Sequence, residues 1–194
     1  MSQGEYASQH ENALRVEIVT TSAQLQHALA IRAICFMEEN GVAAGQSFDG
    51  NDLQATHVVA YLGDEPIGAL RIRWFNDFAA LERTAFRKKY RSPRYLKAAS
   101  IFIFEHIARK GYSRVVTHAS PIYARLWRSL LGFEQVPEKA PTFFVGHTEP
   151  YIELVKKLDV PENAITLSTS ATVLFRVEGQ WDASSKYEAR DQSA

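Results

Sequence analysis

Residues 57–86 decide the fold of this chain, and they read HVVAYLGDEPIGALRIRWFNDFAALERTAF. Three runs rich in β-branched and aromatic residues, 57–62, 66–75 and 78–86, are separated by Gly63-Asp64 and Asn76-Asp77. Short runs of this kind joined by two-residue turn signals are typical of β-hairpins. The stretch therefore predicts a three-stranded antiparallel meander.

The flanking sequence predicts a helix before the meander and alternating elements after it. Residues 14–20 predict a strand, and Thr21 with Gln24 predicts a capping box that starts a helix ending near Gly41. Downstream we expect helices at 96–110 and 121–131, a strand at 114–118, and closing strands at 133–136 and 142–155. This order predicts an α/β fold with a mixed, mostly antiparallel sheet and helices on both faces.

The bulk composition bounds the class of protein. The chain has 194 residues, 46% of them hydrophobic, with 22 basic and 22 acidic side chains. The neutral net charge argues against nucleic acid as a partner. One cysteine, Cys35, excludes an internal disulfide, and no apolar run reaches the length of a membrane span. We expect a cytoplasmic protein that does not bind a membrane.

The sequence suggests one folded unit with extensions. Residues 13–158 form the expected domain, and the polar stretches 1–12 and 182–194 are expected to be flexible tails. Residues 159–181 form a C-terminal extension, in which 164–177 could add a strand to a sheet edge or make a homodimer contact. The sequence does not choose between these two roles.

Five segments carry a family resemblance. They are 32–42 (RAICFMEENGV), 48–57 (FDGNDLQATH), 66–71 (PIGALR), 81–86 (LERTAF) and 131–133 (LGF). In this order and spacing, they resemble the GNAT superfamily of N-acyltransferases over the stretch from about Arg32 to Phe133. The resemblance implies a GNAT-like fold. It also implies transfer of an acyl group, most simply acetyl, from acyl-CoA to a primary amine of a small molecule.

The resemblance also implies where acetyl-CoA would bind. The fourth strand should splay from the fifth, leaving backbone groups of Thr84, Ala85 and Phe86 for the pantetheine arm. An amide near Phe86 would polarise the thioester carbonyl. The pyrophosphate would lie at the start of the following helix, near Arg91, Ser92, Arg94, Tyr95 and Leu96. There the chain keeps the family's arginine and lacks its glycines, and Pro93 has no amide proton.

Two alternatives follow from that departure. Residues 121–133 (PIYARLWRSLLGF) resemble the last helix of long-chain N-acyl amino acid synthases, which, like acyl-homoserine-lactone synthases, take acyl groups from acyl-carrier protein. This alternative predicts an apolar acyl pocket between the fourth and fifth strands, with walls such as Trp74 and Phe104. The other alternative is a non-catalytic acyl-CoA-binding module. From Arg83 to Lys97, both included, the chain carries seven cations and no acid, which suits CoA phosphates or an acidic carrier protein.

The resemblance places Glu82 where family members carry a general base, often acting through water. The alternative is that Glu82 pairs with a neighbouring arginine. Arg128 stands where the family often has a tyrosine that protonates the leaving thiolate, and a guanidinium could stabilise that anion.

The acceptor would bind near Phe36 and the acidic Asp49 and Asp52, which would attract a cationic amine. Arg32 could bind an acceptor carboxylate or pair with one of these aspartates. His57 and His118 lack metal-ligand spacing and are expected to be structural, so the sequence predicts no metal site.

Overall fold

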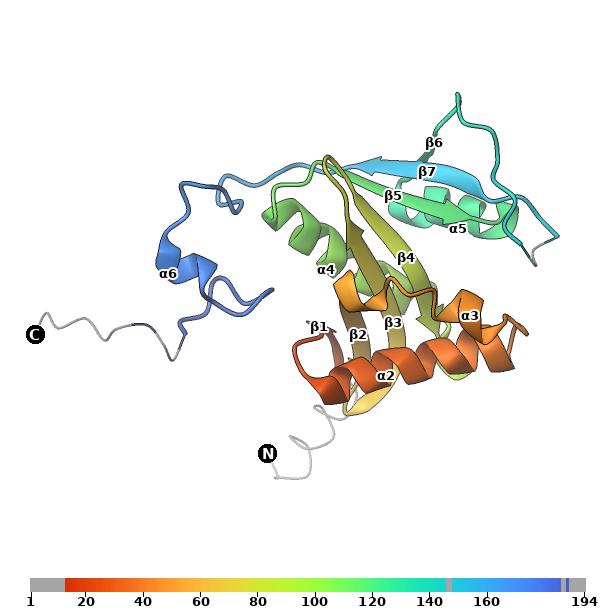
Figure 1. Ribbon diagram of the computed structural model, residues 1–194, viewed down its shortest axis with the longest axis horizontal. Helices are drawn as coiled ribbons and strands as arrows, with labels where there is room; N and C mark the ends of the chain where they lie inside the picture. The colour runs from red at the N-terminus through yellow and green to blue at the C-terminus, as the bar shows by residue number, and fades with distance from the viewer. Residues whose placement is uncertain (1–12, 146–147, 186–187, 189–194) are drawn as a thin grey trace, which may run out of the picture.

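A seven-stranded sheet with the order β1-β2-β3-β4-β5-β7-β6 forms the centre of the fold (Figure 1). The structure is a computed structural model and describes residues 13–145, 148–185 and 188. The strands are β1 (Leu14–Ile18), β2 (Thr56–Leu62), β3 (Glu65–Trp74), β4 (Ala79–Phe86), β5 (Arg114–Ala119), β6 (Glu134–Gln135) and β7 (Ile152–Lys157). Only the β4–β5 pair is parallel among these neighbours. The mixed, mostly antiparallel sheet that we predicted is confirmed.

The helices lie on both faces of the sheet. They are α2 (Ser22–Arg32), which continues into the π-helical η1 (Ala33–Glu38), α3 (Ala44–Ser47), the 3₁₀ turns η2 (Asp52–Gln54) and η3 (Lys88–Tyr90), α4 (Pro93–Arg109), α5 (Pro121–Leu131) and α6 (Ala171–Leu174). None of the helices in the described residues is both long enough and apolar enough to cross a bilayer.

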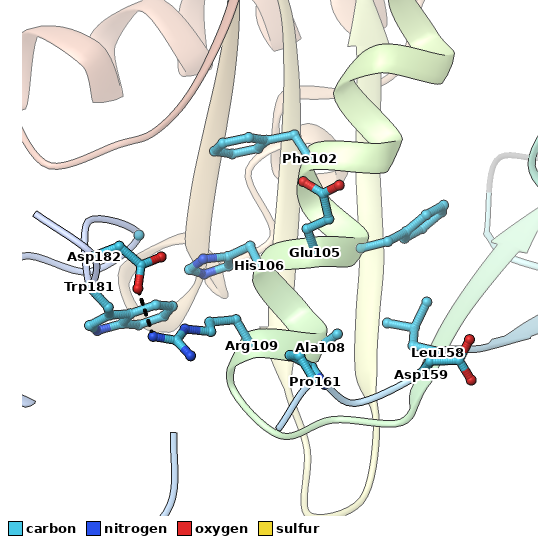
Figure 2. A pocket seen from close by; sticks show the side chains of 12 residues that line it. Phe102, Glu105, His106, Ala108, Arg109, Leu158, Asp159, Pro161, Trp181 and Asp182 are labelled. Atoms are coloured by element: carbon cyan, nitrogen blue, oxygen red, sulfur yellow. Dashed lines mark hydrogen bonds and ion pairs between the residues drawn. The ribbon is translucent and has the colours of Figure 1, made fainter. Parts of the chain in front are cut away.

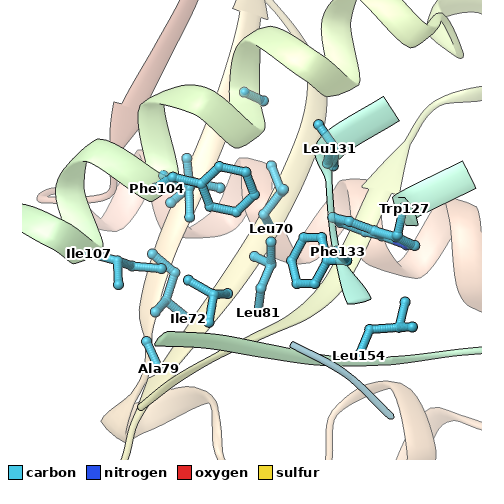
Figure 3. Packing of buried hydrophobic residues seen from close by; sticks show 14 of the residues in the cluster. Leu70, Ile72, Ala79, Leu81, Phe104, Ile107, Trp127, Leu131, Phe133 and Leu154 are labelled. Carbon is cyan, nitrogen blue, oxygen red and sulfur yellow. The ribbon is translucent and has the colours of Figure 1, made fainter. Parts of the chain in front are cut away.

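The alternation of side chains along each strand gives the sheet two apolar faces. Leu70 and Ile72 of β3 point to the face covered by α4 and α5, where they join Phe104 and Phe133 in the main core (Figure 3). Ala69, on the same strand, belongs to a smaller cluster with Ile31 of α2 on the opposite face. The meander therefore contributes side chains to the hydrophobic clusters on both faces of the sheet.

Local sequence signals account for the helix ends. Thr21 accepts a hydrogen bond from the Gln24 amide, and the Gln24 side chain caps the Thr21 amide, so the capping box is confirmed. Gly132 ends α5 in the left-handed conformation at φ 70°, which a glycine adopts without steric cost. Helix α4 starts three residues earlier than predicted because Ser92 caps it and Pro93 suits its first turn.

The structure corrects one expected strand and shows no strand in the C-terminal segment for which a strand was one of two alternatives. The strand predicted at 142–155 begins only at Ile152, and the segment before it keeps one isolated bridge, between Thr142 and Tyr151. Pro150, which lacks an amide proton, stands just before the strand start. Residues 164–177 add no strand: they form turns and the short helix α6. The tail predicted at 1–12 lies outside the described residues, as do 186–187 and 189–194 of the second tail.

The C-terminal extension packs against α4. The Ile165 amide donates to the Arg109 carbonyl at 2.8 Å, and the rings of His106 and Trp181 stack with centroids 5.2 Å apart. Figure 2 shows the pocket that remains between α4 and the extension, with the ion pair of Arg109 and Asp182 at its edge. This pocket lies away from the strands that the family resemblance singles out.

Candidate active site

Strands β4 and β5 separate soon after they meet. Their parallel ladder holds only Ala79 with Val115 and Ala80 with Val116. One residue further, the Thr117 hydroxyl donates to the Leu81 carbonyl at 2.8 Å. Beyond that bond β5 continues beside β7, whereas residues 82–86 of β4 have no ladder partner on the β5 side. The splay expected from the resemblance is present, and we call this point the fork.

A β-bulge in β4 lies next to the fork. The pairing of Ala69 with Ala85 is followed by that of Arg71 with Glu82, so three steps on β4 oppose two steps on β3. Within the bulge Arg83 has φ 51°, the only positive value at a non-glycine position in the described residues. A bulge re-aims side chains, and here Arg83 reaches Asp49 at 2.8 Å on the α2 face.

A network of buried charges ties the loop before β2 to β3 and β4. Arg71 is 1% exposed and donates to Asp49 at 2.7 Å, to Asp52 at 2.9 Å and to Glu82 at 2.6 Å. Arg32 of α2 is 0% exposed and pairs with Asp52 at 2.5 Å. Two guanidinium groups at such depth require partners, because burial of an unpaired charge is costly.

The same network explains the pKa shifts of its carboxyls. The hydrogen bond from Arg71 holds the pKa of Asp49 well below its usual range. Burial acts to raise the pKa of Asp52, but hydrogen bonds from Arg32 and Arg71 outweigh it and the pKa is lowered. Both aspartates are therefore held as anions by arginine.

The predicted acceptor residues are brought together by this network. Arg32, Asp49 and Asp52 meet beneath the α2 face, where the depth and pairing of Arg32 favour the structural role that we weighed for it. Phe36 lies in the π-helical turn after α2 and packs against the smaller core cluster. The structure places these four residues on one face, and their contact with an acceptor stays a prediction.

Glu82 lies at the fork, as predicted for a base, but its carboxylate is heavily engaged. One oxygen accepts from Arg71 Nε at 3.1 Å and from Arg71 Nη2 at 2.6 Å. The other oxygen lies 3.5 Å from Arg73 Nη1. Pairing with a neighbouring arginine, the alternative considered for Glu82, is what the geometry displays.

The residues predicted for acetyl-CoA line the open side of β4 and the start of α4. Ala85 and Phe86 are buried, and the Thr84 hydroxyl is buried without a hydrogen-bond partner among the described residues. Arg91 donates from Nε to the Phe86 carbonyl at 2.9 Å and forms an ion pair with Glu39. Arg91 therefore binds the end of β4 and lies just before the start of α4.

The start of α4 differs from an open anion site. The Ser92 hydroxyl accepts from the Arg94 amide at 3.3 Å, and the Ser92 carbonyl accepts from the amides of Tyr95 and Leu96, both at 3.1 Å. Arg94 is exposed, whereas the Tyr95 and Leu96 side chains pack against the main core. A phosphate at this helix terminus would therefore be bound more by charged side chains than by free backbone amides.

Three further predicted positions are scattered. Arg128 is exposed on α5. Trp74 lies at the closed end of the sheet, opposite Ala79, where its indole nitrogen donates to Thr56 at 2.9 Å. Trp74 therefore does not wall a pocket at the fork, because the β4–β5 ladder closes that end. Phe104 is buried in the main core beside Phe133 (Figure 3).

Sequence reasoning missed a second polar group at the fork. His118 of β5 and Glu153 of β7 are register partners, and His118 Nε2 lies 3.1 Å from Glu153 Oε2. Phe144 and Tyr151 stand beside them, with rings in edge contact. The alternation of side chains along the strand at 114–118 could have indicated which face His118 points to. Its pairing with Glu153 follows only from the β5–β7 register. No cluster of three metal-ligating side chains occurs in the described part of the chain.

No family model matches the chain. Among curated relatives, the uncharacterized protein YyaT of Bacillus subtilis is 30% identical over 120 residues, which cover 60% of this chain and 81% of YyaT. The uncharacterized N-acetyltransferase YjcF of the same organism is 32% identical over 79 residues, covering 41% of this chain and 56% of YjcF.

Solved structures share the overall fold. A crystal structure named as an N-acetyltransferase from Lactobacillus plantarum is 26% identical with a TM-score of 0.68, over 76% of this chain and 99% of that one. FeeM, an N-acyl amino acid synthase from uncultured soil microbes, has a TM-score of 0.64 at 18% identity, over 78% and 92%. A B. subtilis acetyltransferase in complex with CoA has a TM-score of 0.58 at 12% identity, over 75% and 99%.

The fork in the sheet, the bulge beside it and these sequence relatives lead to one conclusion. The chain belongs to the GNAT superfamily and is an acyltransferase.

Proposed function

We propose that the protein transfers an acetyl group from acetyl-CoA to a primary amine of a small molecule. The fork carries this proposal. On the side of β4 that faces β5, residues 82–86 present backbone groups that no strand of the described chain uses, and an acyl-pantetheine arm can pair with them as a strand would. Thr84, Ala85 and Phe86 would hold the arm, and an amide near Phe86 would polarise the thioester carbonyl.

The CoA end of the donor would extend to the start of α4. Arg94 is exposed there, and Arg91, Ser92, Tyr95 and Leu96 shape the turn. The bound CoA in the B. subtilis acetyltransferase supports the choice of donor. The amine would approach from the α2 face, over Phe36 and the loop that carries Asp49 and Asp52. Arg128 as stabiliser of the thiolate and Glu82 as base stay predictions.

The second candidate is long-chain transfer from acyl-carrier protein. Two observations favour it: the amides at the start of α4 are occupied within the turn, and the fold is similar to that of an N-acyl amino acid synthase. The basic residues from Arg83 to Lys97 would then dock the carrier. A third candidate is a module that binds acyl-CoA without turnover. The thiol-release experiment below distinguishes all three candidates.

The test is thiol release by the purified protein. Acetyl-CoA with a panel of small amines should give free CoA only when an amine is present. Discharge of acyl-carrier protein but not of acetyl-CoA would select the second candidate. Calorimetric binding of acetyl-CoA without turnover of any donor would select the third. An Arg94→Ala variant should bind acetyl-CoA about 5- to 10-fold more weakly, since exposed cation–phosphate contacts contribute modestly.

A further inference from the structure

We infer that His118, held by Glu153, accepts the proton that the acceptor amine loses before it attacks the thioester. The inference rests on the proposed acyl transfer and assigns a catalytic residue to it. Three features carry it: the position of His118 relative to the fork, the hydrogen bond that orients its ring, and the engagement of Glu82, the other proton acceptor nearby.

His118 is the first residue of β5 beyond the fork whose side chain points to the α2 face, from which the amine would approach. Val115 and Ala119 belong to the main core under α4 and α5, so alternate residues such as His118 point to the opposite face. On β4, Ala80 is the last paired residue and Glu82 lies two positions beyond it. His118 and Glu82 thus stand two residues past the last pair, on the two arms of the fork.

The ring of His118 is oriented by a carboxylate. Glu153 is 15% exposed, accepts from His118 Nε2 at 3.1 Å, and pairs with Lys139 at 2.5 Å through its other oxygen. A carboxylate at Nε2 favours the tautomer that carries its proton there, which leaves the Nδ1 lone pair as an acceptor. Within the described residues Nδ1 makes no hydrogen bond, and the side chain is 38% exposed.

The surroundings of His118 contain both signs of charge. β7 contributes Glu153, Tyr151 immediately precedes that strand, and Lys139 reaches Glu153 from the preceding loop. Across the fork, Glu82 and Arg83 belong to the arginine–carboxylate network. The Phe144 ring meets the imidazole edge-on with centroids 6.5 Å apart. Both Glu82 oxygens face guanidinium groups, so among the residues that the structure describes His118 is the acceptor at the fork that no cation holds.

The proton balance is simple. An ammonium acceptor loses one proton to His118 Nδ1, directly or through one water, and becomes a neutral nucleophile. Its nitrogen attacks the thioester carbon, the C–N bond forms and the C–S bond breaks. The second nitrogen proton goes to the departing thiolate, giving an amide and free thiol. His118 then returns its proton to solvent, while Glu153 stabilises the transient imidazolium.

The test compares His118→Gln, His118→Ala and Glu153→Gln with the wild type, using acetyl-CoA and the best amine of the panel. His118→Gln should lower kcat/KM by about 100-fold or more, as expected for loss of a general base. It should also abolish the acidic limb of the pH–rate profile while leaving calorimetric binding of acetyl-CoA unchanged. Added imidazole should restore part of the rate that His118→Ala loses. Glu153→Gln should have a kcat/KM between those of the wild type and His118→Gln. His27→Gln, on α2 with its ring against Tyr61, is the matched control.

The outcomes separate this inference from the proposed function. A folded wild-type protein that releases no thiol from acetyl-CoA or from acyl-carrier protein with any amine contradicts acyl transfer itself. An active wild type whose rate and pH profile survive His118→Gln contradicts only the role of His118. The role of His118 is also overturned by a combination of two results. In it, imidazole does not restore the rate of His118→Ala, and the acidic limb of the pH–rate profile is unchanged in His118→Gln. A parallel Glu82→Gln variant that alone abolishes the acidic limb would give the role to Glu82.

Discussion

The ring of Phe86 lies against the Cα of Gly68 on the neighbouring strand, so close that a methyl group at Gly68 would stand 2.6 Å from Phe86 Cδ1. The two residues are register partners at the end of the β3–β4 ladder. Phe86 is also the residue whose amide region we assign to the thioester carbonyl. The absence of a side chain at 68 therefore fixes where the end of β4 sits.

Gly68→Ala should move Phe86 and the backbone around it. Overpacking of a buried site costs about 1–3 kcal/mol, so thermal unfolding should shift down by a few degrees. The catalytic loss should exceed the stability loss, with kcat lowered about 10-fold or more, because oxyanion donors act only at the right position. A Gly68→Ala enzyme with normal kcat would show that the Phe86 backbone is not involved. Gly45→Ala, where no atom lies within 4 Å of the new methyl group, is the control.

One side-chain hydrogen bond joins β4 and β5 at the fork. Thr117→Val keeps the shape of the side chain but leaves the Leu81 carbonyl without its 2.8 Å donor. An unsatisfied buried acceptor costs about 1–3 kcal/mol, which urea unfolding will measure. Thr117→Ser keeps the hydroxyl and should retain most of the stability. Equal losses in the two variants would mean that the hydroxyl bond contributes nothing.

The buried arginine at the centre of the network should be critical for folding. Arg71→Met leaves parts of three carboxylates unpaired and should cost about 3–5 kcal/mol in unfolding free energy. Arg73→Met removes a partly exposed cation 3.5 Å from Glu82 and should cost less than about 1 kcal/mol. Chemical denaturation of both variants at one ionic strength makes the comparison. Similar midpoints would contradict a special role for the buried position.

Attachment of the C-terminal extension should weaken in acid. The hydrogen bond from His106, together with Lys110, lowers the pKa of Glu178 from 4.5 to about 2. A lowered carboxyl pKa stabilises the folded form fully above pH 4.5, and the contribution is lost as the pH falls toward 2. Amide exchange at Ile165, whose hydrogen bond to α4 depends on the docked extension, should speed up over that range.

Glu178→Gln should remove this pH dependence and speed exchange at neutral pH. Asp182→Asn is the control: the Asp182 side chain is 83% exposed, and ion pairs of exposed carboxylates contribute little. If Ile165 exchange in the wild type stays constant between pH 5 and about 3 after correction for the intrinsic rate, then Glu178 does not anchor the extension.

The elements that local signals specify were predictable. The paired turns at Gly63-Asp64 and Asn76-Asp77 define the meander, and Thr21 with Gln24 defines the start of α2. The sequence 164–177 carried β-branched residues without strict alternation, and the structure folds it into turns and α6. Most residues of α6 and its flanks are exposed, and bonds within the segment, such as that from the Leu174 amide to the Ser170 carbonyl, form its turns and helix.

The candidate site was predictable in part. The resemblance placed the fork and Glu82, and residue types alone allowed a pairing of Arg32 with Asp52. The threefold engagement of Arg71 could not be predicted, because its partners come from a loop and another strand. The contact of His118 with Glu153 depends on the β5–β7 register, and 32 residues lie between Ala119, the last residue of β5, and Ile152, the first of β7. The sequence leaves that register open.

The two-residue ladder between β4 and β5 has a consequence for how the chain can be divided. Strands β1 to β4 come from residues 14–86 and strands β5 to β7 from 114–157, so each half of the sheet is continuous in sequence and hydrogen-bonded within itself. A backbone cut near Gly111 would divide the chain into two fragments. Among the strand ladders of the described residues, that of β4 with β5 is the one that joins them. Co-expressed fragments divided there should reassemble through α4 and the shared core, which makes this chain a natural candidate for a split reporter.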